Sequence, residues 1–302
     1  MKHGGKGFAM ANRVRIDPEI SVLSGLLAKL NEVLTSHSKA AVAEPAWNPA
    51  CIDLHYQPKI DLDTGLPVGV EALLRWRGTG GRLVPPDDFL PRIHSIEHLL
   101  SLDLYVLEKA VRQSAIWFAQ GISPVISVNI SAEHFNSITL ADRVEEVLTR
   151  VPAFDPARLA IEILESVAID NIEAAAGIIL RLRKLGIRFY LDDFGTGHSS
   201  AAYLKHLAVD AIKVDRIFAR DIPHGPTSVQ DMAIIEASVS VAQAFGLKVI
   251  AEGVETREAA REVKRLGCQM AQGYYFAKPL PEPEFAAWYA GRCKTAARSG
   301  QF

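Results

Sequence analysis

Cysteine is scarce in this sequence. The 302 residues include only Cys51, Cys268 and Cys293, and no two of them form a CxxC pair. An odd and sparse set argues against a disulfide scaffold and leaves no cysteine pair for zinc. It is more typical of a reducing cytosol than of a secreted protein. We therefore expect a cytoplasmic protein.

Net charge and long apolar runs are also missing. The formal net charge is only −2, which gives no electrostatic basis for binding nucleic acid or an anionic membrane. No uncharged apolar run approaches the ~20 residues of a membrane span. The start, MKHGGKGFAMANR, lacks the apolar stretch of a signal peptide. We expect no nucleic-acid partner and no membrane span, although the sequence could be a fragment or the partner of a membrane protein.

Hydrophobic residues make up 49% of the chain, which is enough for a large core. Residues 17–36, DPEISVLSGLLAKLNEVLTS, predict one amphipathic helix, because apolar residues recur every three or four positions. This helix either packs on the main domain or mediates self-association or signalling. We divide the chain into an N-terminal helix and linker at 1–48, a main domain at 49–295 and a tail at 296–302.

From residue 51 onward, short β-rich segments alternate with amphipathic ones. Strands are predicted at 52–57, 68–74, 124–130, 158–163, 187–192, 210–215, 247–252 and 270–276, with helices such as 172–185 and 229–246 between most of them. This alternation predicts an α/β fold, a TIM-like (β/α)8 barrel. The connection KIDLDTGLPV is too short for a parallel crossover, so the first strand should be antiparallel to the second. An open doubly wound sheet is the alternative.

Polar residues interrupt these apolar strands, mostly toward their C-terminal ends. They are Glu71, Asn129, Glu162, Asp192 with Asp193, Lys213 with Asp215, Glu252 and Gln272. In a (β/α)8 barrel, the C-terminal ends of all the parallel strands open on one face, and that face carries the active site. We therefore expect these side chains to converge, although they lie far apart in the sequence.

Converging carboxylates require a cation. Carboxylate oxygens and the amide oxygen of Asn129 suit Mg²⁺ or Mn²⁺, and this many acids exceeds the demand of one octahedral ion. We predict two ions about 4 Å apart, bridged by Asp192 or Asp193, as in enzymes that hydrolyse phosphodiesters. Lys213 would hydrogen-bond the attacking water or offset phosphate charge, and Arg75 would bind a non-reacting phosphate. Ca²⁺ should compete poorly for octahedral geometry and inhibit.

The two adjacent acids lie in the segment YLDDFGTGHSS. Neighbouring side chains of a strand point to opposite faces, and two adjacent carboxylates repel each other. We predict that the strand ends at Asp192, so that the backbone can turn Asp193 toward the same site, where cations offset the repulsion. Gly195 and Gly197 would let the loop fold over the ions. Without metal, this loop should be the least ordered part of the barrel.

Two other features have simpler interpretations. The segment HSIEH at 94–98 matches a short zinc-peptidase pattern, but no third ligand follows at a recognisable spacing. We interpret its histidines as surface or helix-packing residues. Tyr274, Tyr275 and Phe276 are predicted to lie in the barrel core, with at most one of them at the groove.

Seven segments in order resemble the motif set of EAL-domain phosphodiesterases. They are VEALLRW, SVNIS, LAIEILES, YLDDFGTGHSSAAYLKHL, VDAIKVD, VIAEGVET and AQGYYFAKPLP. The resemblance runs from about His55 to Tyr289. It implies a bacterial enzyme that hydrolyses the messenger cyclic di-GMP to linear pGpG with Mg²⁺ or Mn²⁺, on a barrel with a reversed first strand.

The resemblance also implies a role for each matching residue. The first metal would be bound by Glu71, Asn129, Glu162 and Asp192, and the second would be reached by Asp193, with Asp192 as the bridge. Lys213 would orient the attacking water, and Glu252 would serve as a metal ligand or general base. Substrate contacts would come from Gln57, Leu73, Arg75 and Gln272. Glu165 would anchor the loop that contains Gly195 and Gly197, while Asp215 and Glu255 would support the site.

The same resemblance implies a homodimer, because family members commonly dimerise around the DDFGTG loop and its following helix. His198 stands where tyrosine is common, and FLPRIHSIEHLLSLD departs from the usual pattern, but neither involves a presumed ligand. The alternative function is a receptor that binds cyclic di-GMP without cleaving it. Such relatives usually lose the EAL glutamate, the second aspartate or the loop motif, and this sequence has all three.

Overall fold

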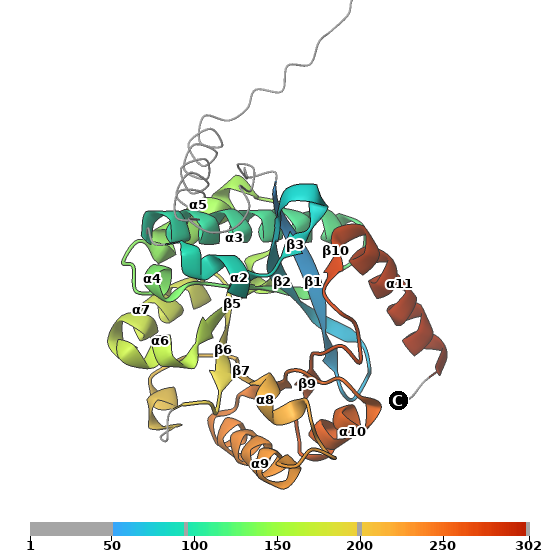
Figure 1. The fold of residues 1–302 in the computed structure, drawn as a ribbon. Coiled ribbons are helices and arrows are strands. Elements are labelled where there is room, and N and C mark those ends of the chain that lie inside the picture. Colours follow the sequence, from blue (N-terminus) through green and yellow to red (C-terminus); the bar gives the residue numbers. More distant parts are fainter. Residues whose placement is uncertain (1–50, 94–95, 198–200, 300–302) are drawn as a thin grey trace, which may run out of the picture.

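Eight strands close into a barrel at the centre of the molecule (Figure 1). The structure, a computed structural model, describes residues 51–93, 96–197 and 201–299. The barrel strands are β1 (Ile52–Asp61), β2 (Pro67–Arg77), β4 (Val125–Asn129), β5 (Leu159–Leu164), β6 (Arg188–Phe194), β7 (Ala211–Val214), β8 (Lys248–Ala251) and β9 (Met270–Ala271). Their order is β1-β9-β8-β7-β6-β5-β4-β2, and pairing of β2 with β1 closes the ring.

The first strand runs against all the others. Every neighbouring pair from β2 through β4 to β9 is parallel, whereas β1 is antiparallel to both β2 and β9. A tight turn joins β1 to β2, and in it the Asp61 carboxylate accepts a hydrogen bond of 2.8 Å from the Thr64 amide. The predicted TIM-like barrel with a reversed first strand is therefore confirmed.

Helices surround the barrel (Figure 1). They are α2 (Pro86–Phe89), α3 (Ile96–Ala119), α4 (Ala132–Phe135), α5 (Leu140–Arg150), α6 (Glu165–Asp170), α7 (Ile172–Arg183), α8 (Arg216–Ala219), α9 (Ser228–Phe245), α10 (Arg257–Arg265) and α11 (Glu282–Ser299). The short strands are β3 (Leu83–Val84) and β10 (Leu280–Pro281), and the 3₁₀ turns are η2 (Thr79–Gly81), η3 (Leu90–Arg92), η4 (Pro156–Arg158) and η5 (Ala201–Lys205). Within the described ranges, no helix is both long and apolar enough to cross a bilayer.

The eighth strand is shorter than the sequence predicts, because the chain turns directly after β9. The amide of Tyr275 donates to the carbonyl of Val254 at 3.0 Å instead of to a neighbouring strand. The amide of Phe276 donates to the carbonyl of Gly273 at 3.1 Å. Tyr274 is 55% exposed and lines the cavity, so it is the one aromatic residue of the three that the sequence prediction allowed at the groove. The two aromatic residues after it are partly buried and pack against the core.

The strands alternate between two apolar layers, as the two-residue period of a strand requires. The outward side chains that pack against the helices include Ile126, Val128, Ile161, Ile163, Phe189, Leu191, Ile212, Val214 and Val249. The inward side chains Ala160, Tyr190, Ala211, Ile250 and Met270 form a separate small cluster. Two positions further along these strands stand Glu162, Asp192, Lys213, Glu252 and Gln272. The same period thus places a polar layer directly above an apolar floor.

Aromatic packing joins the last helix to the reversed strand. Phe285 of α11 is completely buried, and its ring centroid lies 4.8 Å from that of Trp117 on α3. Trp117 packs edge-on against Tyr56 of β1 at 4.6 Å, and its indole nitrogen donates to Glu282 Oε1 at 3.0 Å. These contacts cover the side of the barrel on which strand direction reverses.

Some sequence predictions fall outside the described residues. They include the helix at 17–36 with its linker, His94 and His198. His98, the second histidine of HSIEH, is buried on α3, which agrees with a packing role. Helix α11 continues past residue 295, where we placed the end of the main domain. The boundaries at 48 and 295 stay predictions.

We expect Phe285→Ala to lower the free energy of unfolding by about 3–5 kcal/mol, because it removes a fully buried ring from a packed cluster. Ile138→Ala is the matched control, since Ile138 is 87% exposed and its truncation should stay within about 0.5 kcal/mol. Urea denaturation of both variants measures the difference. Equal losses in the two variants would contradict this account of how the barrel is closed.

Candidate active site

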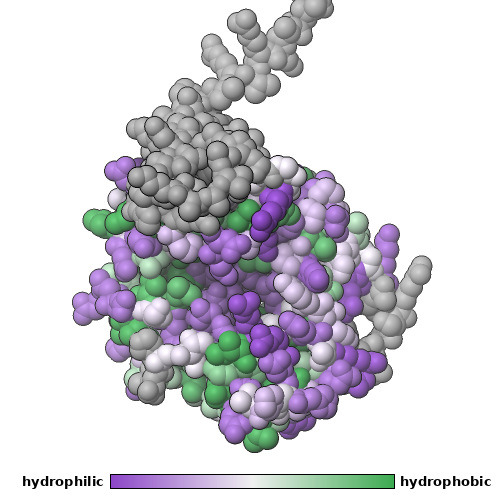
Figure 2. Space-filling view, in the orientation of Figure 1, coloured by the Kyte–Doolittle hydropathy of each residue, from purple (hydrophilic) through white to green (hydrophobic). Residues whose placement is uncertain are grey.

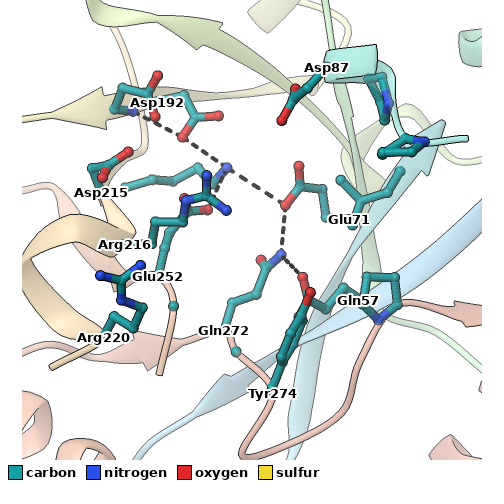
Figure 3. Close-up of a pocket in the computed structure, with 18 of the residues that line it drawn as sticks. Gln57, Glu71, Asp87, Asp192, Asp215, Arg216, Arg220, Glu252, Gln272 and Tyr274 are labelled. Carbon is teal, nitrogen blue, oxygen red and sulfur yellow. Dashed lines mark hydrogen bonds and ion pairs between the residues drawn. The ribbon is translucent and has the colours of Figure 1, made fainter. Parts of the chain in front are cut away.

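A cavity of about 610 Å³ opens where the strands of the barrel end (Figure 3). The space-filling view shows hydrophilic residues gathered around the hollow in this face (Figure 2). Its lining includes these predicted site residues: Gln57, Glu71, Leu73, Arg75, Asp192, Asp193, Lys213, Asp215, Glu252, Glu255 and Gln272. Two other predicted ligands do not line it. Glu162 is buried beneath the cavity, and Asn129 lies at the end of β4, bonded to Glu71.

Lys213 is the centre of the polar layer. Its ammonium group is 1% exposed and lies 2.5 Å from Glu162 Oε2, 2.7 Å from Glu252 Oε1 and 3.0 Å from Asp192 Oδ1. Glu71 Oε2 is farther away, at 3.7 Å. One cation therefore bonds to carboxylates from β5, β6 and the end of β8, and it draws the three strand ends together.

The charges of this layer determine which groups are ionised. Burial disfavours the charged form of Lys213, but the carboxylates of Asp192, Glu162 and Glu252 outweigh burial and hold its pKa well above the usual value. Burial likewise favours the neutral form of Glu162, yet Lys213 and Lys59 lower its pKa to about 2. Glu162 is therefore a permanent anion between two ammonium groups.

Glu71 is held by amide groups. Asn129 Nδ2 donates to Glu71 Oε1 at 2.7 Å, and Gln272 Nε2 donates to Glu71 Oε2 at 2.7 Å. Gln272 Nε2 also lies 2.9 Å from Gln57 Oε1, and Gln57 in turn donates to the carbonyl of Ala277 at 3.1 Å. These bonds connect β1, β2, β4 and the turn after β9, and they fix the direction of the Glu71 carboxylate.

The two adjacent aspartates reach the same cavity through an irregularity in β6. Asp193 has a left-handed backbone, with φ of +57°, and the register with β7 shifts between Leu191 and Phe194. The strand thus continues to Phe194 after a bulge, so our prediction that it ends at Asp192 is wrong. The bulge interrupts the alternation of side chains. As a result, both carboxylates line the cavity, and the Asp193 amide donates to Asp192 Oδ1 at 3.0 Å.

Two carboxyl groups of the cavity hold protons near neutral pH. Burial, a hydrogen bond with Asp215 and the charges of Asp192 and Asp215 raise the pKa of Asp193 to about 7. Burial is also the main cause that raises the pKa of Glu252 to about 8, against the opposing effect of Lys213. The site therefore carries an excess of carboxylates that a single lysine does not neutralise.

The donor atoms at this face fit a hard divalent cation. Asp192, Asp193 and Glu252 each offer a carboxylate oxygen, and these oxygens lie within 4.8 Å of one another. Gln272 Oε1 is buried without a hydrogen-bond partner in the described part of the chain. Oxygen donors of this kind suit Mg²⁺ or Mn²⁺, whereas no cysteine or histidine among the described residues lines the cavity.

Glu165 ties the loop after β6 to the helix layer. Its Oε2 accepts a hydrogen bond of 3.3 Å from the Gly195 amide, and its Oε1 accepts one of 2.7 Å from the Tyr203 hydroxyl. Gly195 has φ of +96°, and a Cβ there would lie 3.3 Å from the Phe218 ring. Gly197 has an ordinary φ and open space around it, so the backbone requires glycine only at 195.

The sequence did not direct us to several residues of the site. Arg216 of α8, Arg220 directly after that helix, Asp87 of α2 and Tyr274 line the cavity (Figure 3), and Lys59 lies beneath it. The arginines could have been found from their spacing, since residues four apart on a helix share a face. Asp87 and Tyr274 lie on connecting segments and carry no such signal.

Comparison with known proteins agrees with this geometry. The EAL-domain family profile matches residues 50–279. The chain is 38% identical over 243 residues to "Cyclic di-GMP phosphodiesterase PdeR" of Escherichia coli strain K12, covering 80% of this chain and 36% of PdeR. It is 37% identical over 235 residues to "Bifunctional diguanylate cyclase/cyclic di-GMP phosphodiesterase MucR" of Pseudomonas aeruginosa, covering 78% of this chain and 34% of MucR. The chain thus spans about a third of the length of these relatives.

Solved structures show the same architecture. The PaMucR phosphodiesterase in its c-di-GMP complex has a TM-score of 0.75 and 34% identity, covering 86% of this chain and 99% of that one. The EAL domain of Mycobacterium smegmatis DcpA has a TM-score of 0.66 and 30% identity, covering 80% and 97%. The matched residues span the barrel from β1 to the turn after β9, which carries the acidic cavity, and on this basis the chain belongs to the EAL-domain family.

Proposed function

We propose that this chain hydrolyses cyclic di-GMP to linear pGpG by an in-line attack of water on one phosphodiester. The observation that carries the proposal is the ring of carboxylates around Lys213 at the mouth of an EAL barrel. Relatives named as cyclic di-GMP phosphodiesterases support it, as does the similar PaMucR structure in complex with c-di-GMP.

Within this proposal, two sets of oxygen ligands would hold two ions of Mg²⁺ or Mn²⁺. Glu71, Asn129, Glu162 and Asp192 would hold the first ion, and Asp193 would hold the second together with Asp192. Glu252 would act as a further ligand or as the general base. When bound, such ions lower the pKa of a coordinated water and neutralise charge on the phosphodiester. Lys213 has three N–H donors, and one of them would turn from a carboxylate to donate a hydrogen bond to the attacking water. In its ionised form, Glu252, beside Lys213, would accept the proton that the water loses.

Cations and apolar surfaces of the cavity suit the rest of a cyclic dinucleotide. Arg75, Arg216 and Arg220 line the cavity around the acids and offer guanidinium groups to the phosphate that does not react. Leu73 and the exposed ring of Tyr274 provide surfaces against which a guanine can pack. Gln57 and Gln272 complete the contacts on the β1 side.

The organisation around the barrel is also a proposal. We propose that residues 49–295 act as the catalytic unit and that two copies associate through the DDFGTG loop and the segment that follows it. Glu165 supports the proposed association, because it bonds both the loop and Tyr203. It would therefore couple the position of the loop to contacts made by the segment that follows it. The N-terminal segment 1–48 would then regulate the barrel in this chain or in a longer protein.

We expect Glu71→Gln to reduce turnover of cyclic di-GMP by more than about 100-fold, because it removes a charged metal ligand. Loss of a group that only orients such a ligand already lowers metal affinity or activity by about 10- to 100-fold. The assay follows pGpG with Mg²⁺ or Mn²⁺, and Ca²⁺ should inhibit it. Glu258→Gln on the exposed face of α10 is the control and should retain activity. Tight binding of cyclic di-GMP by the unaltered chain without turnover would support the receptor alternative instead.

Binding of Mn²⁺ should strengthen as pH rises from 6 to 8. Protons occupy Asp193 up to a pKa of about 7 and Glu252 up to about 8, and a metal ion must displace them, so lower pH weakens binding. Calorimetry in buffers with different ionisation enthalpies counts the protons released. Asp215→Asn removes one cause of the raised pKa of Asp193 and should reduce proton release at pH 7. A pH-independent affinity would contradict this protonation pattern.

Tyr203→Phe should loosen the loop after β6, because the buried carboxylate of Glu165 loses its donor. We expect a loss of about 1–3 kcal/mol in the free energy of unfolding and faster amide hydrogen exchange at residues 193–197. Tyr275→Phe is the control, since its hydroxyl has no hydrogen-bond partner among the described residues. Identical exchange in the two variants would show that Glu165 does not hold the loop through Tyr203.

A further inference from the structure

A second lysine lies beneath the acidic layer, and neither the strand-end pattern nor the motifs assigned it a role. Lys59 of β1 is 1% exposed, and its ammonium group donates hydrogen bonds to Glu162 Oε1 and to Ser127 Oγ. Glu162 Oε2 bonds instead to Lys213, at 2.5 Å. The two oxygens of one buried carboxylate are thus held by two different lysines.

The barrel interior leaves space for the Lys59 side chain. Gly69 is the register partner of Lys59 on β2, and a Cβ at position 69 would lie 3.4 Å from both Cβ and Cδ of the lysine. The ammonium group lies 5.4 Å from the centroid of the Tyr190 ring, which belongs to the inward apolar cluster. Lys59 therefore rises from the apolar floor to the polar layer.

A net gain in stability is a weak explanation for a buried ion pair such as Lys59 with Glu162. Two buried charges are costly to desolvate, and replacing both partners of such a pair by apolar side chains of similar volume is often neutral or stabilising. Lys59 instead contributes to the site through its hydrogen bond to Glu162, a carboxylate that the proposed function uses as a metal ligand. The inference rests on that proposed function.

We propose that Lys59 is a positioning residue that orients Glu162 toward the cation site. The bond at Oε1 fixes the plane of the carboxylate, so that Oε2 bonds to Lys213, which itself lines the cavity. Without it, Oε1 loses its only donor among the described residues, and the carboxylate turns both oxygens toward Lys213. Lys213 would then be drawn from Asp192 and Glu252, to which it bonds at 3.0 and 2.7 Å.

The test is Mn²⁺ binding to the full chain, measured by calorimetry without substrate. Lys59→Met, which keeps the length and removes the charge, should weaken Mn²⁺ binding by about 10- to 100-fold, the range for groups that orient metal ligands. Activity should recover in part at high Mn²⁺. Lys109→Met is the control, because Lys109 bonds to the carbonyl of Ile52 on the same strand, far from Glu162, and its loss should change Mn²⁺ affinity less than twofold.

A double-mutant cycle with Glu162→Gln separates positioning from a general structural effect. If Lys59 acts through Glu162, adding Lys59→Met to Glu162→Gln causes no further loss of Mn²⁺ affinity. This double variant also leaves no unpaired buried carboxylate, so it folds even where Lys59→Met alone does not. Wild-type Mn²⁺ affinity in Lys59→Met, or an equal further loss in the Glu162→Gln background, would overturn the inference.

These outcomes are independent of catalysis. A chain that binds Mn²⁺ but leaves cyclic di-GMP uncleaved would refute the proposed function, and the cycle would still decide the role of Lys59. A chain that turns over cyclic di-GMP while Lys59→Met binds Mn²⁺ normally would refute only the inference.

Discussion

The ammonium group of Lys213 is the interaction on which the rest of the site depends. It neutralises part of a buried cluster of carboxylates that arrive from separate strands, and without it those strand ends would repel one another. Its charge is insufficient for all of them, as the raised pKa values of Asp193 and Glu252 indicate. The remaining carboxylate charge is what makes this face of the barrel suited to cations.

The barrel meets this electrostatic demand by separating its interior into layers. Small and aromatic residues such as Ala160 and Tyr190 fill the floor, and charged residues begin two positions later on the same strands. The outward residues pack against the helices and carry most of the hydrophobic core. The inward face of each strand thus carries the buried charges of the site, and the outward face carries the hydrophobic core. The free energy from burying that core offsets the cost of desolvating the charges.

The alternation of strands and helices was sufficient to predict the barrel, the short connection KIDLDTGLPV to predict its reversed first strand, and the polar residues at strand ends to predict the convergence of Glu71, Asp192 and Glu252. The bulge in β6 was not predictable, because it depends on pairing with β7 after Leu191. Lys59 was missed for a similar reason. It lies on the strand that runs backwards, so its side chain reaches the polar layer from the opposite end, and a rule based on C-terminal strand ends does not include it.

The left-handed backbone of Asp193 has a consequence for how this position is studied. Only glycine, asparagine and aspartate adopt such a φ readily, whereas alanine there costs about 1–2 kcal/mol of backbone strain. An alanine substitution would therefore change two properties at once, the charge and the conformation of the bulge. Asparagine preserves the conformation and removes only the charge. Because of the bulge, few substitutions of Asp193 change its charge without also changing the backbone conformation.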